Sequence, residues 1–148
     1  NHGKAFELLK PGKKKSSKHA AELDSKKDYT SDEKCVKCHT TGYEKPGGFV
    51  SFKSTPKLAG VGCEMCHGPG EHYRRIHQSK RRNFTREEVK AVGQIYATED
   101  PDICKRCHGH KDTPFKSSLD EKYTDDVNAL MKKNRKAFHD FYEVVGKH

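Results

Sequence analysis

Three stretches decide how this chain folds: Cys35-Val-Lys-Cys-His39, Cys63-Glu-Met-Cys-His67 and Cys104-Lys-Arg-Cys-His108. Each has the form C-x-x-C-H, which is the attachment signature of c-type haem. Two cysteine thioethers reach the two vinyl groups of one porphyrin, and the histidine that follows presents its imidazole to the iron. We therefore predict three haems c (iron), bound through Cys35, Cys38, Cys63, Cys66, Cys104 and Cys107, with His39, His67 and His108 as proximal ligands.

Other uses of paired cysteines explain this pattern less well. A zinc site takes four ligands from two such pairs, and three pairs with a histidine fixed after each do not divide in that way. Disulfides and thioredoxin-like redox pairs do not require the histidine. All six cysteines of the chain belong to the three motifs, so none is left over for another purpose.

The composition shows why the haems matter for folding. Of 148 residues, 31% are hydrophobic, 34% are charged and none is tryptophan. A polypeptide this polar buries too little apolar surface to offset the entropy lost on ordering its backbone. The porphyrins must supply the core, so we predict a single triheme cytochrome c domain over residues 1–148. We expect it to be mainly α-helical and loop-rich, wrapped around a cluster of three haems, with little or no sheet.

Local signals place short helices around the motifs. The apolar spacing predicts a helix over residues 1–10. Ser31 as a cap, with Asp32 and Glu33 in the first turn, predicts a helical turn over 31–39. A capping-box pattern at the start of 85–96 predicts a further helix there. Residues 49–52 are the one stretch that favours a strand, and the spacing over about 120–146 predicts a C-terminal helical segment.

Three features bear on the compartment. No apolar run approaches the roughly 20 residues that a membrane-spanning helix needs. No secretory signal is visible at Asn1, so we expect a chain that is already processed or excised from a longer one. Covalent haem attachment takes place outside the cytoplasm, a compartment that also suits this use of cysteine. We therefore predict a periplasmic or cell-surface protein, secreted across the cytoplasmic membrane.

Histidine is unusually frequent in the chain, which has ten. Three proximal ligands account for only part of this number, and a second axial imidazole on each iron is the economical explanation. Each remaining histidine also has an ordinary interpretation as a surface residue. The candidates for the second axial position are His2, His19, His72, His77, His110, His139 and His148.

Several longer stretches carry a family resemblance. They are Cys35-Val-Lys-Cys-His-Thr-Thr-Gly-Tyr43, then Gly60-Val-Gly-Cys-Glu-Met-Cys-His-Gly-Pro-Gly70, and Cys104-Lys-Arg-Cys-His108 followed by Thr113-Pro-Phe115. Together they resemble the cytochrome c-554 family of multihaem electron carriers. The opening His2-Gly-Lys-Ala-Phe6 is similar to that family's His-x-x-Ala-aromatic helix, and the match extends to about Tyr123.

The chain departs from the family pattern in one respect. Family members typically carry four haems, and their first C-x-x-C-H precedes the His-x-x-Ala segment. Here that motif is absent, and no histidine occurs from Thr40 to Cys66, where the family has the partner ligand of its first haem. The resemblance therefore implies a three-haem form lacking the family's first haem, either natural or produced by trimming.

The resemblance also implies which histidines complete each iron. His2 would be the distal ligand of the His67 haem. His72 would complete the His108 haem, with His77 as the alternative. The counterpart of the His39 haem is five-coordinate in the resembled carrier, so this position is either vacant here or filled by His19 or His110.

The charge indicates the kind of partner. The chain has 30 basic and 21 acidic residues, a net charge of +9, which haem propionates reduce. A cationic carrier is steered towards acidic redox partner proteins, in an encounter that salt weakens. No aromatic-basic recognition motif is present, so we expect no nucleic acid partner. Membrane contact is at most peripheral, through the basic stretches 13–18 and 80–82.

Three functions fit these features. The first is electron transfer by three closely spaced haems held by two histidines each, with no catalytic residue. The second is a redox enzyme that acts on a small nitrogen oxide or hydroxylamine at a five-coordinate His39 haem. The third is a homo-oligomer, a haem filament or a subunit of a respiratory complex, in which His2 or His148 ligates a neighbouring iron.

Overall fold

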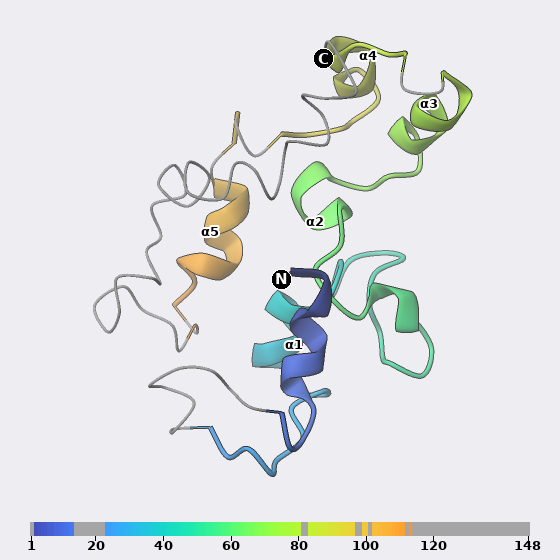
Figure 1. Ribbon diagram of the computed structural model, residues 1–148. Coiled ribbons are helices and arrows are strands. Elements are labelled where there is room, and N and C mark those ends of the chain that lie inside the picture. The colour runs from blue at the N-terminus through green and yellow to red at the C-terminus, as the bar shows by residue number, and fades with distance from the viewer. Residues whose placement is uncertain are drawn as a thin grey trace. The chain divides into compact units, whose positions relative to one another are not determined.

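The structure of the chain, a computed structural model, is built from short helices (Figure 1). It describes residues 2–13, 23–80, 83–96, 99–100, 102–111 and 113, and within these ranges there is no strand. No helix in the described ranges is long and apolar enough to span a bilayer. The elements, with η for a 3-10 helix, are η1 (His2–Leu9), α1 (Glu33–His39), η3 (Pro56–Leu58), α2 (Glu64–His67), α3 (Tyr73–Ser79), α4 (Arg86–Lys90) and α5 (Asp102–His108).

The chain divides into two compact units. The first comprises Asn1–Met65 with His110–Phe115, and the second comprises Cys66–Gly109 with Lys116–His148. The boundary falls inside α2, between Met65 and Cys66 of the second C-x-x-C-H motif. The single-domain organisation stays a prediction.

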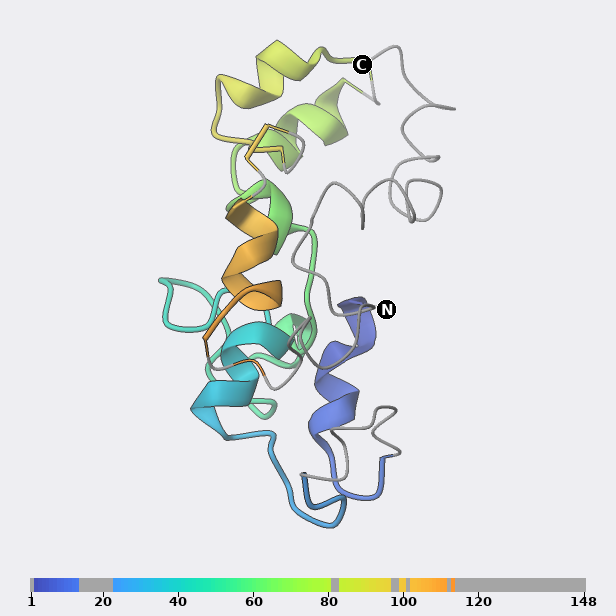
Figure 2. The same ribbon diagram turned by 90° about the vertical axis from the view of Figure 1, so that its left-hand side faces the viewer.

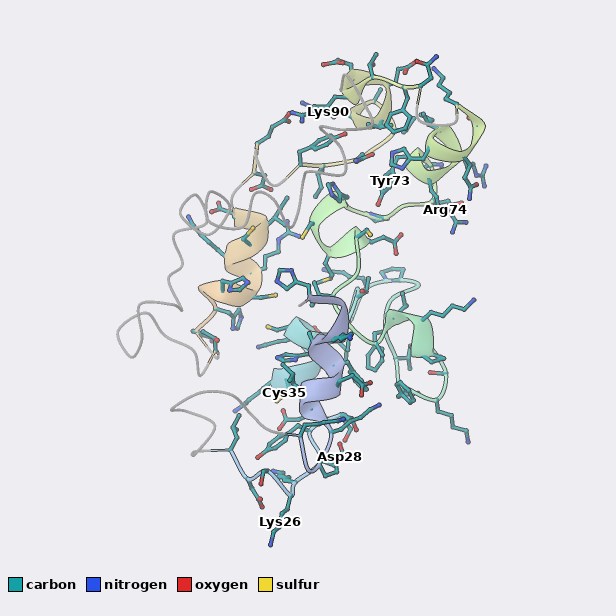
Figure 3. All side chains as sticks on the ribbon, in the orientation of Figure 1. Lys26, Asp28, Cys35, Tyr73, Arg74 and Lys90 are labelled. Carbon is teal, nitrogen blue, oxygen red and sulfur yellow. The ribbon has the colours of Figure 1, made fainter. Side chains whose placement is uncertain are left out.

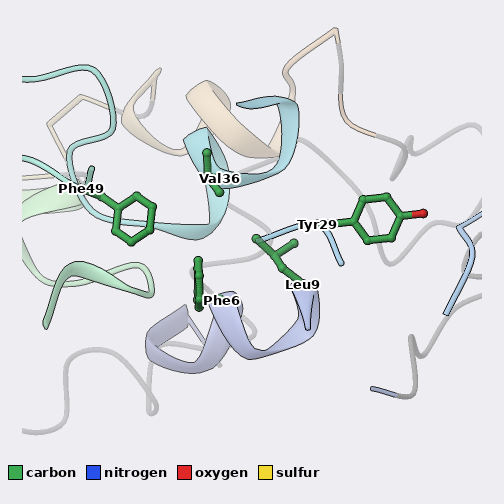
Figure 4. Packing of buried hydrophobic residues seen from close by; sticks show 5 residues of the cluster. All are labelled: Phe6, Leu9, Tyr29, Val36 and Phe49. Carbon is green, nitrogen blue, oxygen red and sulfur yellow. The ribbon is translucent and has the colours of Figure 1, made fainter. Parts of the chain in front are cut away.

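The first unit is organised by the packing of η1 against α1, which lie side by side in both views (Figures 1 and 2). Phe6 of η1 and Val36 of α1 belong to one buried apolar cluster, and the ring of Phe49, in the loop after α1, lies 5.5 Å from the ring of Phe6. Burial of such side chains is the main favourable contribution to folding. The buried cluster consists of Phe6, Leu9, Tyr29, Val36 and Phe49 (Figure 4).

A loop stabilised by a buried threonine follows α1. The hydroxyl of Thr41 donates to the carbonyl of Gly60, at 2.7 Å, and accepts from the backbone N–H of Gly62, at 2.8 Å. The N–H of Gly42 donates to the Met65 sulfur at 3.2 Å. These hydrogen bonds tie the end of the first C-x-x-C-H motif to the start of the second.

The second unit contains the packed pair α3 and α4. Tyr73 of α3 and Val89 of α4 are buried, whereas Arg74, next to Tyr73, is exposed and points away (Figure 3). The Tyr73 hydroxyl donates to the carbonyl of Gly68 at 2.9 Å, which connects α3 to the residue after the second motif.

Most local predictions agree with the structure. The helices over 1–10 and 31–39 are confirmed as η1 and α1, and the capping box at Thr85 is present, although α4 ends at Lys90 because the chain turns at Gly93, which has a φ of 95°. The strand predicted over 49–52 is wrong. The hydroxyl of Thr55 accepts from the N–H of Val50 and folds this stretch into a turn. The predicted C-terminal helical segment lies outside the described residues.

Candidate haem sites

Each C-x-x-C-H motif ends at its histidine on a short helix, namely α1, α2 or α5, and Cys63 lies just before α2. Side chains three positions apart on an α-helix share a face. In α1 and α5 both cysteines are helical, so their sulfurs lie on one side of the helix, and the histidine follows at its last residue. This is the arrangement that two thioethers and one proximal imidazole to the same porphyrin require.

The backbone of η1 holds the imidazole of His39. Its Nδ1 lies 2.7 Å from the carbonyl oxygen of Ala5, and an N–H at Nδ1 donates to this oxygen. Burial lowers the pKa of His39, although the hydrogen bond to Ala5 opposes the shift. The ring is therefore neutral near neutral pH, with Nε2 as its lone-pair nitrogen, which is the form that ligates iron.

His67 is held in the same way by a different segment. Its Nδ1 lies 3.0 Å from the carbonyl oxygen of Ile95, and the Ile95 N–H donates to the His67 carbonyl, also at 3.0 Å. The ring of Tyr96 meets the His67 imidazole edge-on, with centroids 5.7 Å apart. In two of the motifs a backbone carbonyl thus holds Nδ1 of the histidine. This contact sets the tautomer and leaves Nε2 as the nitrogen that can bind iron.

His108 ends the third motif helix. The Asp100 carboxylate accepts from the N–H of Asp102, at 3.2 Å, at the start of α5, and Ile103 is the buried residue of this helix. Burial lowers the pKa of His108, which favours the neutral imidazole.

The cysteines and histidines fit covalently bound haem c. All six cysteines lie in the described residues, and none forms a disulfide. Cys35 (labelled in Figure 3) packs against the apolar cluster of the first unit, so a porphyrin attached there extends an existing core. We expect the three cysteine pairs to hold haem and the three motif histidines to supply the proximal ligands.

The backbone of His2 is fixed beside the second motif. The N–H of Val61, two residues before Cys63, donates to the His2 carbonyl at 3.1 Å. Gly60 has a φ of 126°, and a Cβ there would lie 2.5 Å from the Gly3 carbonyl oxygen. Only glycine allows η1 to approach so closely. The His2 side chain is exposed.

His72 and His77, the two candidate distal ligands at α3, differ in their surroundings. The Nε2 of His77 lies 3.1 Å from Oε1 of the buried Gln94, and its ring stacks on Phe84 with centroids 4.4 Å apart. His72, just before α3, is exposed and makes no side-chain hydrogen bond to the helix terminus. His77 is therefore part of the internal packing of its unit, and His72 is accessible.

Of the remaining candidate distal ligands, only His110 lies in the described residues. His110 is half-buried and belongs to the first unit, the unit that contains His39. His19, His139 and His148 lie outside the described residues.

Sequence reasoning missed several groups around the motifs. The carbonyls of Ala5 and Ile95 carry no sequence signature, because any residue has a backbone oxygen. Folding brings Tyr96 into contact with His67, and it brings the guanidinium carbon of Arg86 to 4.6 Å from the centre of the Tyr96 ring. Tyr96 lies well outside the second motif, so its spacing gives no signal of this contact.

Comparison with known proteins agrees with these sites. The family model for cytochrome c554 and c-prime matches residues 1–68. Cytochrome c-554 of Nitrosomonas europaea is 37% identical over 161 residues, covering 98% of this chain and 68% of that protein. The solved structure of reduced cytochrome c554 from the same organism is 36% identical with a TM-score of 0.72, over 89% of this chain and 71% of the other. The chain belongs to the cytochrome c-554 family and is a multihaem c-type electron-transfer cytochrome.

Proposed function

We propose that the chain carries three haems c and transfers electrons outside the cytoplasm, with every iron held by two imidazoles. The haems attach at the cysteine pairs of α1, α2 and α5. Haem, when bound, supplies a one-electron iron couple at each site.

The fixed orientation of His39 and His67 is the observation that carries this proposal. Their Nδ1 atoms are anchored to the carbonyls of Ala5 and Ile95, so neither ring needs to turn when the charge at its Nε2 changes. Two imidazoles on one iron keep it low-spin, with little geometric change between oxidation states. A rigid ligand set of this kind favours rapid electron transfer over substrate binding at the iron.

The distal ligands follow from what surrounds each histidine. The hydrogen bond from Val61 to the His2 carbonyl supports His2 as the ligand of the haem at Cys63. The accessibility of His72 supports it for the His108 haem, since His77 is hydrogen-bonded to Gln94. The membership of His110 in the unit of His39 supports it for the His39 haem, with His19 as the alternative.

The partners we propose are acidic redox proteins. The net charge is +9, and cations such as Lys53 and Arg74 are exposed. Opposite charges steer the encounter of two redox proteins and do so less as salt screens them. Electron exchange with an acidic partner should therefore slow as ionic strength rises.

Haem counting tests the proposal. Intact mass spectrometry of the secreted protein, with haem quantitation, should give three haems per chain, and the Cys104→Ala/Cys107→Ala variant should give two. All the haems should reduce and reoxidise reversibly. Fewer than three haems would contradict the proposed haem content, and rapid turnover of hydroxylamine or a nitrogen oxide by the wild-type protein would contradict the electron-carrier function.

A further inference from the structure

A charged cluster lies against the proximal histidine of the second motif. The guanidinium carbon of Arg86, on α4, lies 4.6 Å from the ring centre of Tyr96, and the edge of that ring meets the His67 imidazole. Tyr96 therefore contacts both Arg86 and His67. All three belong to the second unit.

The environment of Arg86 weakens the screening of its charge. Its Nε is buried and has no hydrogen-bond partner among the described residues, so solvent does not reach the guanidinium on that side. The side chain as a whole is 41% exposed, which leaves it partly screened. A cation in such a position acts on neighbouring groups more strongly than one in open solvent.

Two further charges complete the cluster. Glu99 lies 3.9 Å from a terminal nitrogen of Arg86 and 2.6 Å from Nζ of Lys90, which Figure 3 labels on α4. One anion between two cations leaves the cluster with a net positive charge. Removal of Arg86 makes it neutral, and removal of the Glu99 charge makes it more positive.

We propose that Arg86 raises the reduction potential of the haem attached at Cys63 and Cys66, acting across Tyr96 and His67, whose rings are in edge-on contact. The inference rests on the proposed haem site at this motif. Reduction adds one negative charge to the haem, and a nearby cluster with a net positive charge stabilises the reduced state relative to the oxidised state. Arg86 acts on the reduction potential through its charge and does not contact a substrate.

The two charge changes predict shifts of opposite sign. Arg86→Gln should lower the reduced-to-oxidised ratio of one haem several-fold at a fixed solution potential, and Glu99→Gln should raise the ratio of the same haem. Arg86→Lys keeps the charge and should restore most of the wild-type ratio. Lys53→Gln, an exposed residue of the first unit, removes the same charge and should leave that haem unchanged.

The experiment is a redox titration of the purified holoprotein followed by NMR, with the haem methyl signals assigned to their attachment sites. Intact mass of each variant first establishes that the haem at Cys63 and Cys66 is present, since its absence would overturn the proposed haem site rather than the role of Arg86. With that haem present, three results would overturn the role of Arg86. They are shifts of the same sign in Arg86→Gln and Glu99→Gln, no shift in either, and an Arg86→Lys variant that behaves like Arg86→Gln.

Discussion

The backbone N–H of Val61 donates a hydrogen bond to the carbonyl oxygen of His2, over 3.1 Å, and thereby joins the first turn of η1 to the segment that leads into Cys63. The bond forms because Gly60 and Gly3 approach with no side chain between them. It connects the residue proposed as a distal iron ligand to the motif whose haem it would complete.

Gly60→Ala should break this connection. The new Cβ would lie 2.5 Å from the Gly3 carbonyl, at a φ of 126° that alanine rarely adopts. We expect a lower melting temperature and a high-spin signal from one haem, as His2 moves away. Gly47→Ala is the control. It has a φ of 74° and open space around the Cβ, so it should cost only the backbone strain of about 1–2 kcal/mol. Equal effects of the two variants would contradict this account.

Thr41→Val should destabilise the first unit. Valine has the same shape as threonine but cannot donate to the carbonyl of Gly60, which is a buried residue, whereas Gly62 is an exposed one. One unsatisfied buried acceptor costs about 1–3 kcal/mol. Denaturant unfolding of the holoprotein measures this loss. Thr41→Ser keeps the hydroxyl and should recover most of it, and a Thr41→Val variant as stable as the wild type would refute the assigned role.

Replacement of His72 and of His77 should have different effects. His72→Ala should convert one haem to the high-spin form, because it removes the proposed distal ligand of the His108 haem. His77→Ala should leave every iron low-spin and lower the unfolding free energy by about 1–3 kcal/mol, since Gln94 loses a buried partner. Electron paramagnetic resonance and thermal unfolding separate the two effects. High-spin iron in His77→Ala alone would reverse the assignment.

The capping box of α4 should make stability depend on pH. The hydrogen bond from Lys80, and then the one from the Thr85 N–H, lower the pKa of Glu88 below its ordinary value of 4.5. A carboxyl with a lowered pKa stabilises the fold fully above its unfolded pKa, and this stabilisation is lost as the pH falls through the folded value.

Thermal unfolding between about pH 6 and 2 should show this acid loss in the wild type and less of it in Glu88→Gln. Lys80→Met removes the larger cause and should weaken the loss in part. An acid limb that is identical in Glu88→Gln and in the wild type would show that Glu88 does not contribute.

The sequence predicts local features of this molecule well, because their causes are local. The C-x-x-C-H motifs and the Thr85 capping box each lie within a few residues of chain, and the structure places them on or at the start of helices. Residues 49–52 show the opposite case. Their spacing favours a strand, but the Thr55 hydroxyl takes a backbone N–H that a sheet would need.

The contacts that orient the proximal histidines could not be predicted from the sequence, for a different reason. Ala5 and Ile95 act through their carbonyls, and the side chain gives no sign of that role. The choice between His72 and His77 likewise depends on Gln94 and Phe84, which only the folded chain brings to His77. Such contacts are set by tertiary structure and have no sequence pattern of their own.

The electron paramagnetic resonance spectrum of the oxidised holoprotein, with its haem content measured on the same sample, tests the central claim most directly. The account predicts three haems per chain and low-spin ferric signals only, because each iron has two imidazole ligands. A high-spin signal equivalent to one haem in three would contradict it. That result would mean an open face on one iron and would favour small-molecule chemistry at the His39 haem.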